Sequence, residues 1–295
     1  MIARLALALF GAPAAVRRAR ANAVHAMATF DRTARPMIGD VALASALAPW
    51  SVKGAHLIAA WCKLAGLPFP AGTAVLGCCF ARIYDDVLDA RGTDPAVGER
   101  FTLLLGGGPF VARSSLERVL SSLYSELSTR LGGDRTHPVR LALVELHRYQ
   151  LLSRPGTSAA TLHERTMRKG GLSLFVLFSL AEREMAAADR DLVFDLGGCL
   201  QMIDDYQDRD ADRRVGIPTL ATVGSLRWSA ILRRLRSIER AATGRYGRAA
   251  TREFFTDIYL FLIVARIGRI WRRGLRPPRS PLGVLVVRGG SVLPG

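Results

Sequence analysis

Residues 77–90 read GCCFARIYDDVLDA, and residues 197–212 read GGCLQMIDDYQDRDAD. In both stretches the pattern Asp-Asp-x-x-Asp follows an apolar run at helical spacing. On a helix, aspartates four residues apart share one face. The aspartates paired in this way are Asp85 with Asp89, and Asp204 with Asp208 and Asp212. Carboxylates at this spacing repel each other, so each cluster costs stability unless a cation offsets its charge.

The doubled acidic pattern favours a metal site. Acidic residues on a helix usually form a solvated face, and a single copy would be weak support for a site. Here both copies follow apolar segments and lie far apart in the chain, which allows two helices to face each other. Mg²⁺ binds oxygen ligands and is commonly shared between carboxylates and substrate phosphates. The pattern therefore predicts a pocket that holds a phosphate ester through bridging Mg²⁺ ions.

The rest of the chain also has a helical pattern. Apolar residues recur at helical spacing, or in long runs, in eight segments: 54–66, 71–90, 114–131, 138–153, 158–184, 189–213, 226–245 and 250–272. Glycine and proline separate these segments, and no strand pattern of useful length precedes the C-terminal tail. We expect an all-α, single-domain bundle of about ten helices around a central cavity. The expected divisions are a basic helical extension (1–40), the helical domain (41–275) and a loose basic tail (276–295).

Composition narrows the partners and the compartment. The net charge of +16 suits nucleic acid, an anionic membrane surface or anionic substrates, but no nucleic-acid-binding motif accompanies it. We therefore expect no nucleic acid partner. The four cysteines show no metal-ligand spacing, which indicates buried thiols in the cytoplasm. Residues 254–271 are apolar and precede a basic stretch, so they form either a bundle helix or a peripheral membrane contact.

Four places in the sequence resemble the trans-isoprenyl diphosphate synthases, the polyprenyl synthetase family, whose fold is shared with class I terpene synthases. The resemblance covers roughly residues 45–225. It rests on YDDVLD (Tyr84–Asp89), LGGCLQMIDDYQD (Leu196–Asp208), Lys169 in RKGGLSLF, and Gln150 in YQLL. The paired acidic motifs are specific to the family, whereas Lys169 and Gln150 alone would not be.

The resemblance implies an allylic prenyl diphosphate as substrate and a cluster of roughly three Mg²⁺ ions that neutralises its departing pyrophosphate. The implied catalytic residues are Asp85, Asp86, Asp89, Asp204, Asp205, Asp208 and Lys169. The expected metal ligands among them are Asp85, Asp89, Asp204 and Asp208; Asp86 and Asp205, with Asp212, are either ligands or supports. The expected substrate-binding residues are Lys53, Phe80, Arg82, Tyr84, Gln150, Gln201 and Asp212. Members of the family are often dimeric, so a homodimer is a further expectation.

Departures from the family pattern bear on the reaction. The family's Gly-Gly-Lys-Arg-x-Arg-Pro segment, which binds isopentenyl diphosphate, corresponds here to residues 48–54, where only Lys53 is charged. The later Gly-Lys pair is replaced by Gly216 and Ile217. A second diphosphate needs fixed cations. The sequence therefore favours a terpene-synthase-like enzyme over a chain-elongating prenyltransferase, unless Lys53, Arg91 and Arg100 together replace the lost contacts. A non-catalytic regulatory relative and a membrane-binding protein are further alternatives.

Aromatic and histidine residues give further expectations. Phe80 lies five residues before Asp85, where bulky residues of the resembled family limit product length, so a short or medium prenyl chain is expected. Side chains that could face a carbocation, or simply pack in the core, are Trp61, Phe80, Tyr84, Tyr149, Phe175 and Phe178. Three histidines show no catalytic or metal spacing and are expected to be satisfied or exposed: His56, His147 and His163.

Overall fold

The computed structural model describes residues 2–91, 95–152 and 158–272. These residues form helices, and no strand occurs among them. In chain order the helices are α1 (Ile2–Thr33), α2 (Arg35–Ile38), α3 (Val41–Ala65), α4 (Ala71–Arg91), α5 (Pro95–Gly106), α6 (Ser115–Arg130), α7 (Pro138–Leu152), α8 (Ala159–Ser179), α9 (Ala187–Val215), α10 (Trp228–Tyr246) and α11 (Arg248–Arg272). The prediction of an all-α bundle is confirmed, and the predicted central cavity stays a prediction.

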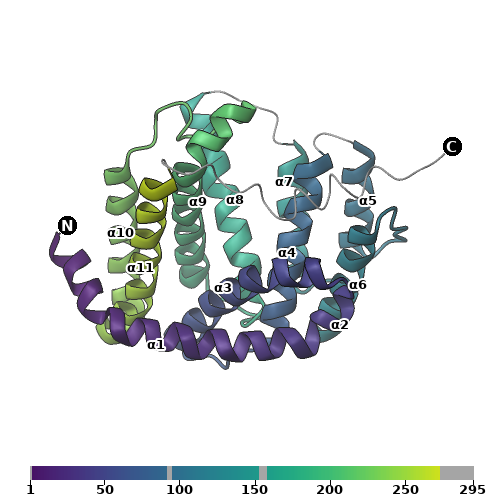
Figure 1. Cartoon of the computed structure of the whole chain (residues 1–295), viewed down its shortest axis with the longest axis horizontal. Coiled ribbons are helices and arrows are strands. Elements are labelled where there is room, and N and C mark those ends of the chain that lie inside the picture. The colour runs from purple at the N-terminus through teal and green to yellow at the C-terminus, as the bar shows by residue number, and fades with distance from the viewer. Residues whose placement is uncertain (1, 92–94, 153–157, 273–295) are drawn as a thin grey trace.

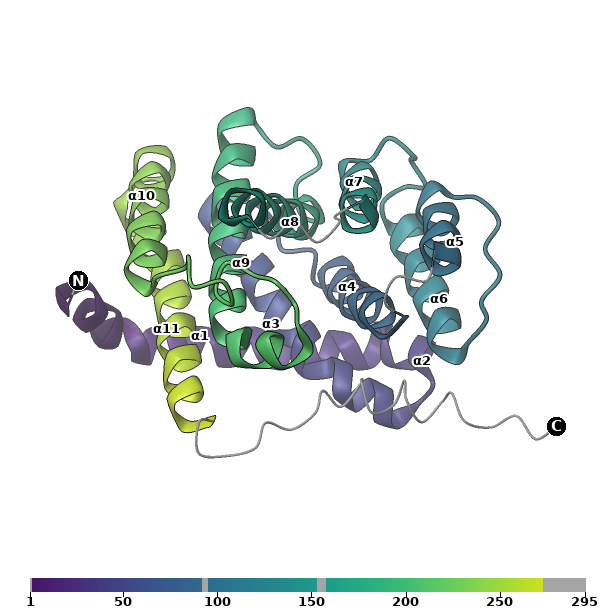
Figure 2. The same ribbon diagram turned by 90° about the horizontal axis from the view of Figure 1, so that it is seen from above.

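The helices pack around α4. Seen from above, α4 lies between α3, α6, α7 and α8 (Figure 2), and it also contacts α1 and α5. Helix α1 runs along the base of the upright helices (Figure 1) and packs on α3, α4 and α11. Its second half contributes Ala26 and Phe30 to the core, so this part of the expected N-terminal extension belongs to the bundle. The expected tail, residues 276–295, lies outside the described residues.

The observed helices differ from the predicted segments mainly near the N-terminus. Helix α3 begins at Val41 rather than at residue 54, because Pro49 lies inside the helix instead of ending it. Asp40 caps the helix by accepting a hydrogen bond from the backbone N–H of Leu43 at 2.8 Å. Helix α5 was not predicted, because its twelve residues lie among the glycines and prolines that the sequence pattern assigns to a loop.

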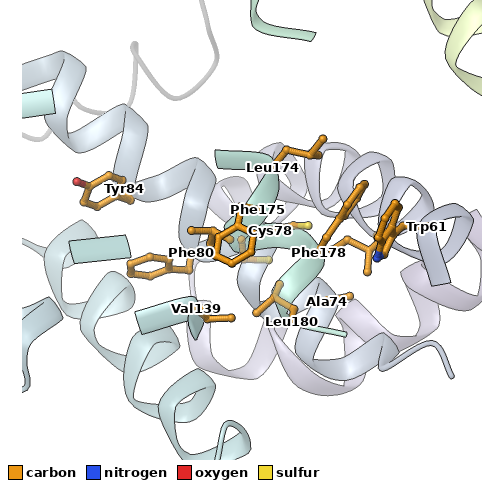
Figure 3. Packing of buried hydrophobic residues seen from close by; sticks show 14 of the residues in the cluster. Trp61, Ala74, Cys78, Phe80, Tyr84, Val139, Leu174, Phe175, Phe178 and Leu180 are labelled. Carbon is orange, nitrogen blue, oxygen red and sulfur yellow. The ribbon is translucent and has the colours of Figure 1, made fainter. Parts of the chain in front are cut away.

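The core is rich in aromatic side chains. Trp61 of α3 and Phe178 of α8 are fully buried and stack with ring centroids 4.7 Å apart (Figure 3). Phe80 of α4 is also fully buried and contacts the rings of Tyr84 and Tyr124. These contacts support the core-packing alternative for Trp61, Phe80 and Phe178. They join α3, α4, α6 and α8 into one apolar cluster.

Two further predictions concern thiols and membranes. All four cysteines are free and buried, as expected from their apolar surroundings, and burial raises the pKa of Cys199 to about 12. One helix of the described part of the chain, α3, is long and apolar enough to cross a membrane by length and composition. Its Leu47, Ile58 and Trp61 side chains are fully buried in the bundle, as in a core helix.

Glycines bring α8 and α9 into backbone contact. A β-carbon built on Gly197 would lie 2.2 Å from the carbonyl oxygen of Gly170, and one built on Gly170 would lie 2.3 Å from that of Gly197. Only glycine fits at these two positions, because the obstructing atoms are backbone atoms that cannot move aside. Lys169 is next to this crossing on α8, and Gln201 follows one turn after it on α9. The crossing therefore sets the distance between Lys169 and the second acidic motif.

Candidate functional site

Both acidic motifs lie toward the same end of the bundle. Helices α4 and α9 both run from the lower to the upper part of Figure 1, and each carries its aspartates in its C-terminal half. Helix α8 runs in the opposite direction beside α9, so its N-terminal half reaches the same end. The two acidic motifs and the N-terminal half of α8 are therefore brought to one end of the molecule.

In the second motif, Asp205 is turned toward α8. Its side chain is buried and accepts hydrogen bonds from Oγ1 of Thr166 at 2.9 Å and from Nε2 of Gln201 at 3.1 Å. Burial raises the pKa of Asp205, and these two donors oppose that shift. Both carboxylate oxygens are thus bonded within the protein. This geometry favours a supporting role for Asp205 over direct metal ligation.

The remaining aspartates of α9 carry mutually repelling charge. Burial and the carboxylates of Asp208, Asp205 and Asp204 together raise the pKa of Asp212 to about 6, against the opposing effect of Lys169. Asp204 and Asp208 are exposed to solvent. Three neighbouring carboxylates thus repel the charge of Asp212, and a bound cation would relieve this repulsion.

In the first motif, Asp86 is tied to its own helix. Nη2 of Arg82, one turn earlier on α4, forms an ion pair with Oδ1 of Asp86. The sequence left open whether Arg82 pairs with an aspartate or faces a phosphate, and here it pairs. Asp85 is half-buried, and its charge adds to burial in raising the pKa of Tyr84. Asp89 is on α4, but its side chain lies outside the described residues.

A hydrogen-bonded chain behind the first motif includes His147. Nε2 of His147 lies 2.9 Å from the backbone oxygen of Gly98, which can only accept, so this nitrogen carries the proton. Nδ1 must then accept a hydrogen bond from the hydroxyl of Tyr84. The same hydroxyl lies 3.1 Å from the side-chain atom of Gln150 that is placed as Oε1. Because the hydroxyl has one proton, Gln150 satisfies all contacts when its NH₂ group points to the tyrosine oxygen.

His147 was missed as a site residue by sequence reasoning, although it is satisfied as expected. The available signal was its position three residues before Gln150 on α7, which places both side chains on one face. The other two histidines behave as predicted. His56 contacts Asn22 and Asp257, with Nε2 3.6 Å from the aspartate oxygen, and His163 is exposed.

Helix α3 adds an aromatic ring and a cation to this end of the bundle. The side chain of Lys53 reaches solvent, yet protein atoms crowd its ammonium, and this burial lowers its pKa while the charge of Asp204 opposes the shift. The ammonium lies 5.2 Å from the ring centroid of Trp50, and the guanidinium carbon of Arg82 lies 4.7 Å from the same centroid. Lys53 was predicted from the family pattern, whereas Trp50 was not predicted.

Arg100 of α5 has a carboxylate partner on α6. It pairs with Glu117, whose side chain is fully buried. Glu117 also accepts a hydrogen bond from the backbone N–H of Arg113 at 2.6 Å. The sequence left open whether Arg100 joins Lys53 and Arg91 in binding a second diphosphate, and here Arg100 pairs with Glu117 instead. The side chain of Arg91 lies outside the described residues.

The donor chemistry of this region suits Mg²⁺, but the side chains do not form a ready-made metal centre. Among the described residues, no three histidine, cysteine, aspartate or glutamate side chains are arranged to hold an ion. Instead, Arg82 pairs with Asp86 of the first motif, Arg82 and Lys53 both lie over the ring of Trp50, and the charge of Asp204 in the second motif opposes the lowering of the Lys53 pKa. The predicted Mg²⁺ cluster stays a prediction.

Comparisons with protein families, with characterised proteins and with solved structures found no match for this chain. The resemblance to isoprenyl diphosphate synthases therefore rests on the motifs of the sequence.

Proposed function

We propose that this protein is a Mg²⁺-dependent class I isoprenoid synthase that ionises an allylic prenyl diphosphate. The observation that carries the proposal is the repulsion among the carboxylates of α9, where burial and the charges of Asp208, Asp205 and Asp204 raise the pKa of Asp212. A purely structural helix face would gain nothing from this repulsion. A site that binds Mg²⁺ and a diphosphate uses it to hold the metal.

The residues of the chain divide the work. Mg²⁺, when bound by Asp204 and Asp208 together with Asp85 of the first motif, would supply the positive charge that makes pyrophosphate a good leaving group. Lys169 lies close enough to Asp205 and Asp212 to affect both, and it donates hydrogen bonds to phosphate oxygens. Thr166 and Gln201 hold Asp205 and thereby keep this segment of α9 in a fixed orientation toward α8.

The reaction class follows from the number of diphosphates that the site can bind. Three cations were considered for a second diphosphate: Lys53, Arg91 and Arg100. Arg100 pairs with Glu117, so among the described side chains of these three, Lys53 is the one affected by the charge of an acidic motif. One such cation is little compensation for a second multivalent anion. This supports a terpene-synthase-like lyase, in which pyrophosphate release is followed by cyclisation, elimination or quenching. Chain elongation with isopentenyl diphosphate is the alternative.

The test is incubation of the full chain with geranyl, farnesyl or geranylgeranyl diphosphate and Mg²⁺, with and without isopentenyl diphosphate. Released pyrophosphate is measured by a coupled assay, and products are identified by mass spectrometry. Hydrocarbon or alcohol formed without isopentenyl diphosphate supports the lyase, whereas longer diphosphates support the transferase. Absence of pyrophosphate release from every substrate would contradict the proposal.

A pair of aspartate variants makes the test specific. Asp204→Asn removes an exposed carboxylate of the motif and should reduce pyrophosphate release at least about a hundredfold, because metal-bound charge is lost. Asp191→Asn is the matched control, since Asp191 is an equally exposed aspartate on the same helix. Equal activity of the two variants would show that the motif does not bind the metal.

A further inference from the structure

Trp50 is placed unusually for a large aromatic side chain. It lies on α3 with 46% of its surface exposed, so it contributes little to the core. Two cations lie over its ring, Lys53 at 5.2 Å and Arg82 at 4.7 Å from the centroid. Distances below about 6 Å are those at which the electron-rich face of an indole attracts a cation. The ring thus holds one cation from its own helix and one from α4.

Each of these cations also faces a different acidic motif. Lys53 interacts electrostatically with Asp204 of α9, and Arg82 forms the ion pair with Asp86 of α4. Trp50 therefore contacts both a cation that is paired with the first motif and a cation that is affected by the charge of the second.

An aromatic ring holds a cation differently from a carboxylate. A carboxylate neutralises the charge, whereas an indole restricts the side chain and leaves its N–H groups and most of its positive charge available. Lysine and arginine have long flexible side chains that lose much rotamer freedom when they bind a ligand. A ring that restricts them beforehand reduces this loss. Moreover, no described residue accepts a hydrogen bond from the buried Nε of Arg82.

We propose that Trp50 is a positioning residue that holds Lys53 and Arg82 ready to bind the diphosphate of the substrate. Mg²⁺ held by the acidic motifs would offset the charge of their carboxylates, so that Lys53 and Arg82 could donate to the phosphate oxygens while the ring keeps them at the site. This inference rests on the proposed function, because it needs a diphosphate bound at the two motifs. It adds a residue of α3 that neither acidic motif contains.

The test measures binding of inorganic pyrophosphate in the presence of Mg²⁺ by isothermal titration calorimetry, with the full-length chain. Trp50→Leu keeps an apolar side chain but removes the ring, and it should weaken binding by about tenfold. Trp50→Phe keeps an aromatic face and should stay within about threefold of the wild type. Because the side chain is half exposed, both variants should keep the unfolding temperature of the wild type, which is measured in parallel.

A second background shows whether Trp50 acts through the lysine. In Lys53→Met, the further change Trp50→Leu should weaken pyrophosphate binding clearly less than it does in the wild type, since one of the two cations is already gone. Equal losses in both backgrounds, or a loss in Trp50→Phe as large as in Trp50→Leu, would overturn the inference.

Failure of the proposed function gives a different result. If the wild-type chain itself does not bind pyrophosphate with Mg²⁺, the isoprenoid synthase proposal fails before Trp50 is considered. If the wild type binds and Trp50→Leu binds equally well, the proposed function stands and the positioning role of Trp50 is wrong.

Discussion

Replacing Gly197 by alanine should separate α8 from α9 and disturb the second acidic motif. The new β-carbon would lie 2.2 Å from the carbonyl oxygen of Gly170 and 2.8 Å from the β-carbon of Leu174. An ordinary contact of this kind is about 3.4 Å or more, so the helices must move apart by about 1 Å. No side-chain rotation can relieve the contact, because the nearest atoms are backbone atoms of the neighbouring helix.

The expected loss of stability follows from two opposing terms. Overpacking of this kind costs about 3 kcal/mol, at the upper end of the usual range. Replacing a helical glycine by alanine stabilises the helix by about 1 kcal/mol. The net loss of about 2 kcal/mol corresponds to a fall of roughly 3 °C in the unfolding temperature of a chain of this size. Differential scanning calorimetry measures this fall.

The same displacement should affect catalysis more than stability. A movement of about 1 Å stretches the 2.9 Å hydrogen bond from Thr166 to Asp205 beyond hydrogen-bonding distance. Misplacement of this size commonly costs about a hundredfold in rate. Gly244→Ala is the matched control, because a β-carbon at this helical glycine of α10 meets no atom within 4 Å. The reasoning is refuted if Gly197→Ala unfolds at or above the temperature of Gly244→Ala.

Three further predictions concern side chains described above. Tyr84→Phe removes the hydroxyl that binds Nδ1 of His147 and should lower the free energy of unfolding by about 1–3 kcal/mol in urea titrations; an unchanged midpoint would contradict the hydrogen-bonded chain. The pKa of Asp212 is raised to about 6, so the folded state binds this proton more tightly than the unfolded state does, and the free energy of unfolding should fall as the pH rises from about 4 to 6. Asp212→Asn or added Mg²⁺ should therefore raise the unfolding temperature at pH 7, and no rise in either case would argue against charge repulsion on α9. Glu117→Gln leaves the charge of Arg100 without its partner and should lower the free energy of unfolding by about 3 kcal/mol, while pyrophosphate binding stays unchanged. A loss of pyrophosphate binding in a folded variant would show that the pair of Arg100 and Glu117 contributes to the site.

Much of the helical fold could be predicted from local sequence pattern. The segments 71–90 and 189–213 correspond closely to α4 and α9, because apolar residues at helical spacing have to be buried on one face. The start of α3 was misplaced because proline in a helix interior costs roughly 3 kcal/mol. In this chain the burial of Leu43 and Leu47, which lie in the first two turns of α3, offsets that cost.

The candidate site divides in a similar way. The sequence pointed to Asp205, Lys169 and Gln201, which lie together where α8 meets α9. It did not point to Thr166 or Trp50. Each of these acts on a partner that lies far away in the chain, and a threonine or tryptophan on a helix has no local feature that indicates such a partner.

The helical class of the fold and the position of each acidic motif on its helix can therefore be predicted from the sequence, since both depend on spacing between near neighbours. The pairing of cations with carboxylates depends on how the helices pack. Arg100 pairs with Glu117, and Lys53 faces Asp204, because the packing of distant helices places those charges together. Charge pairing across a bundle depends on distances in space, which local sequence pattern does not contain.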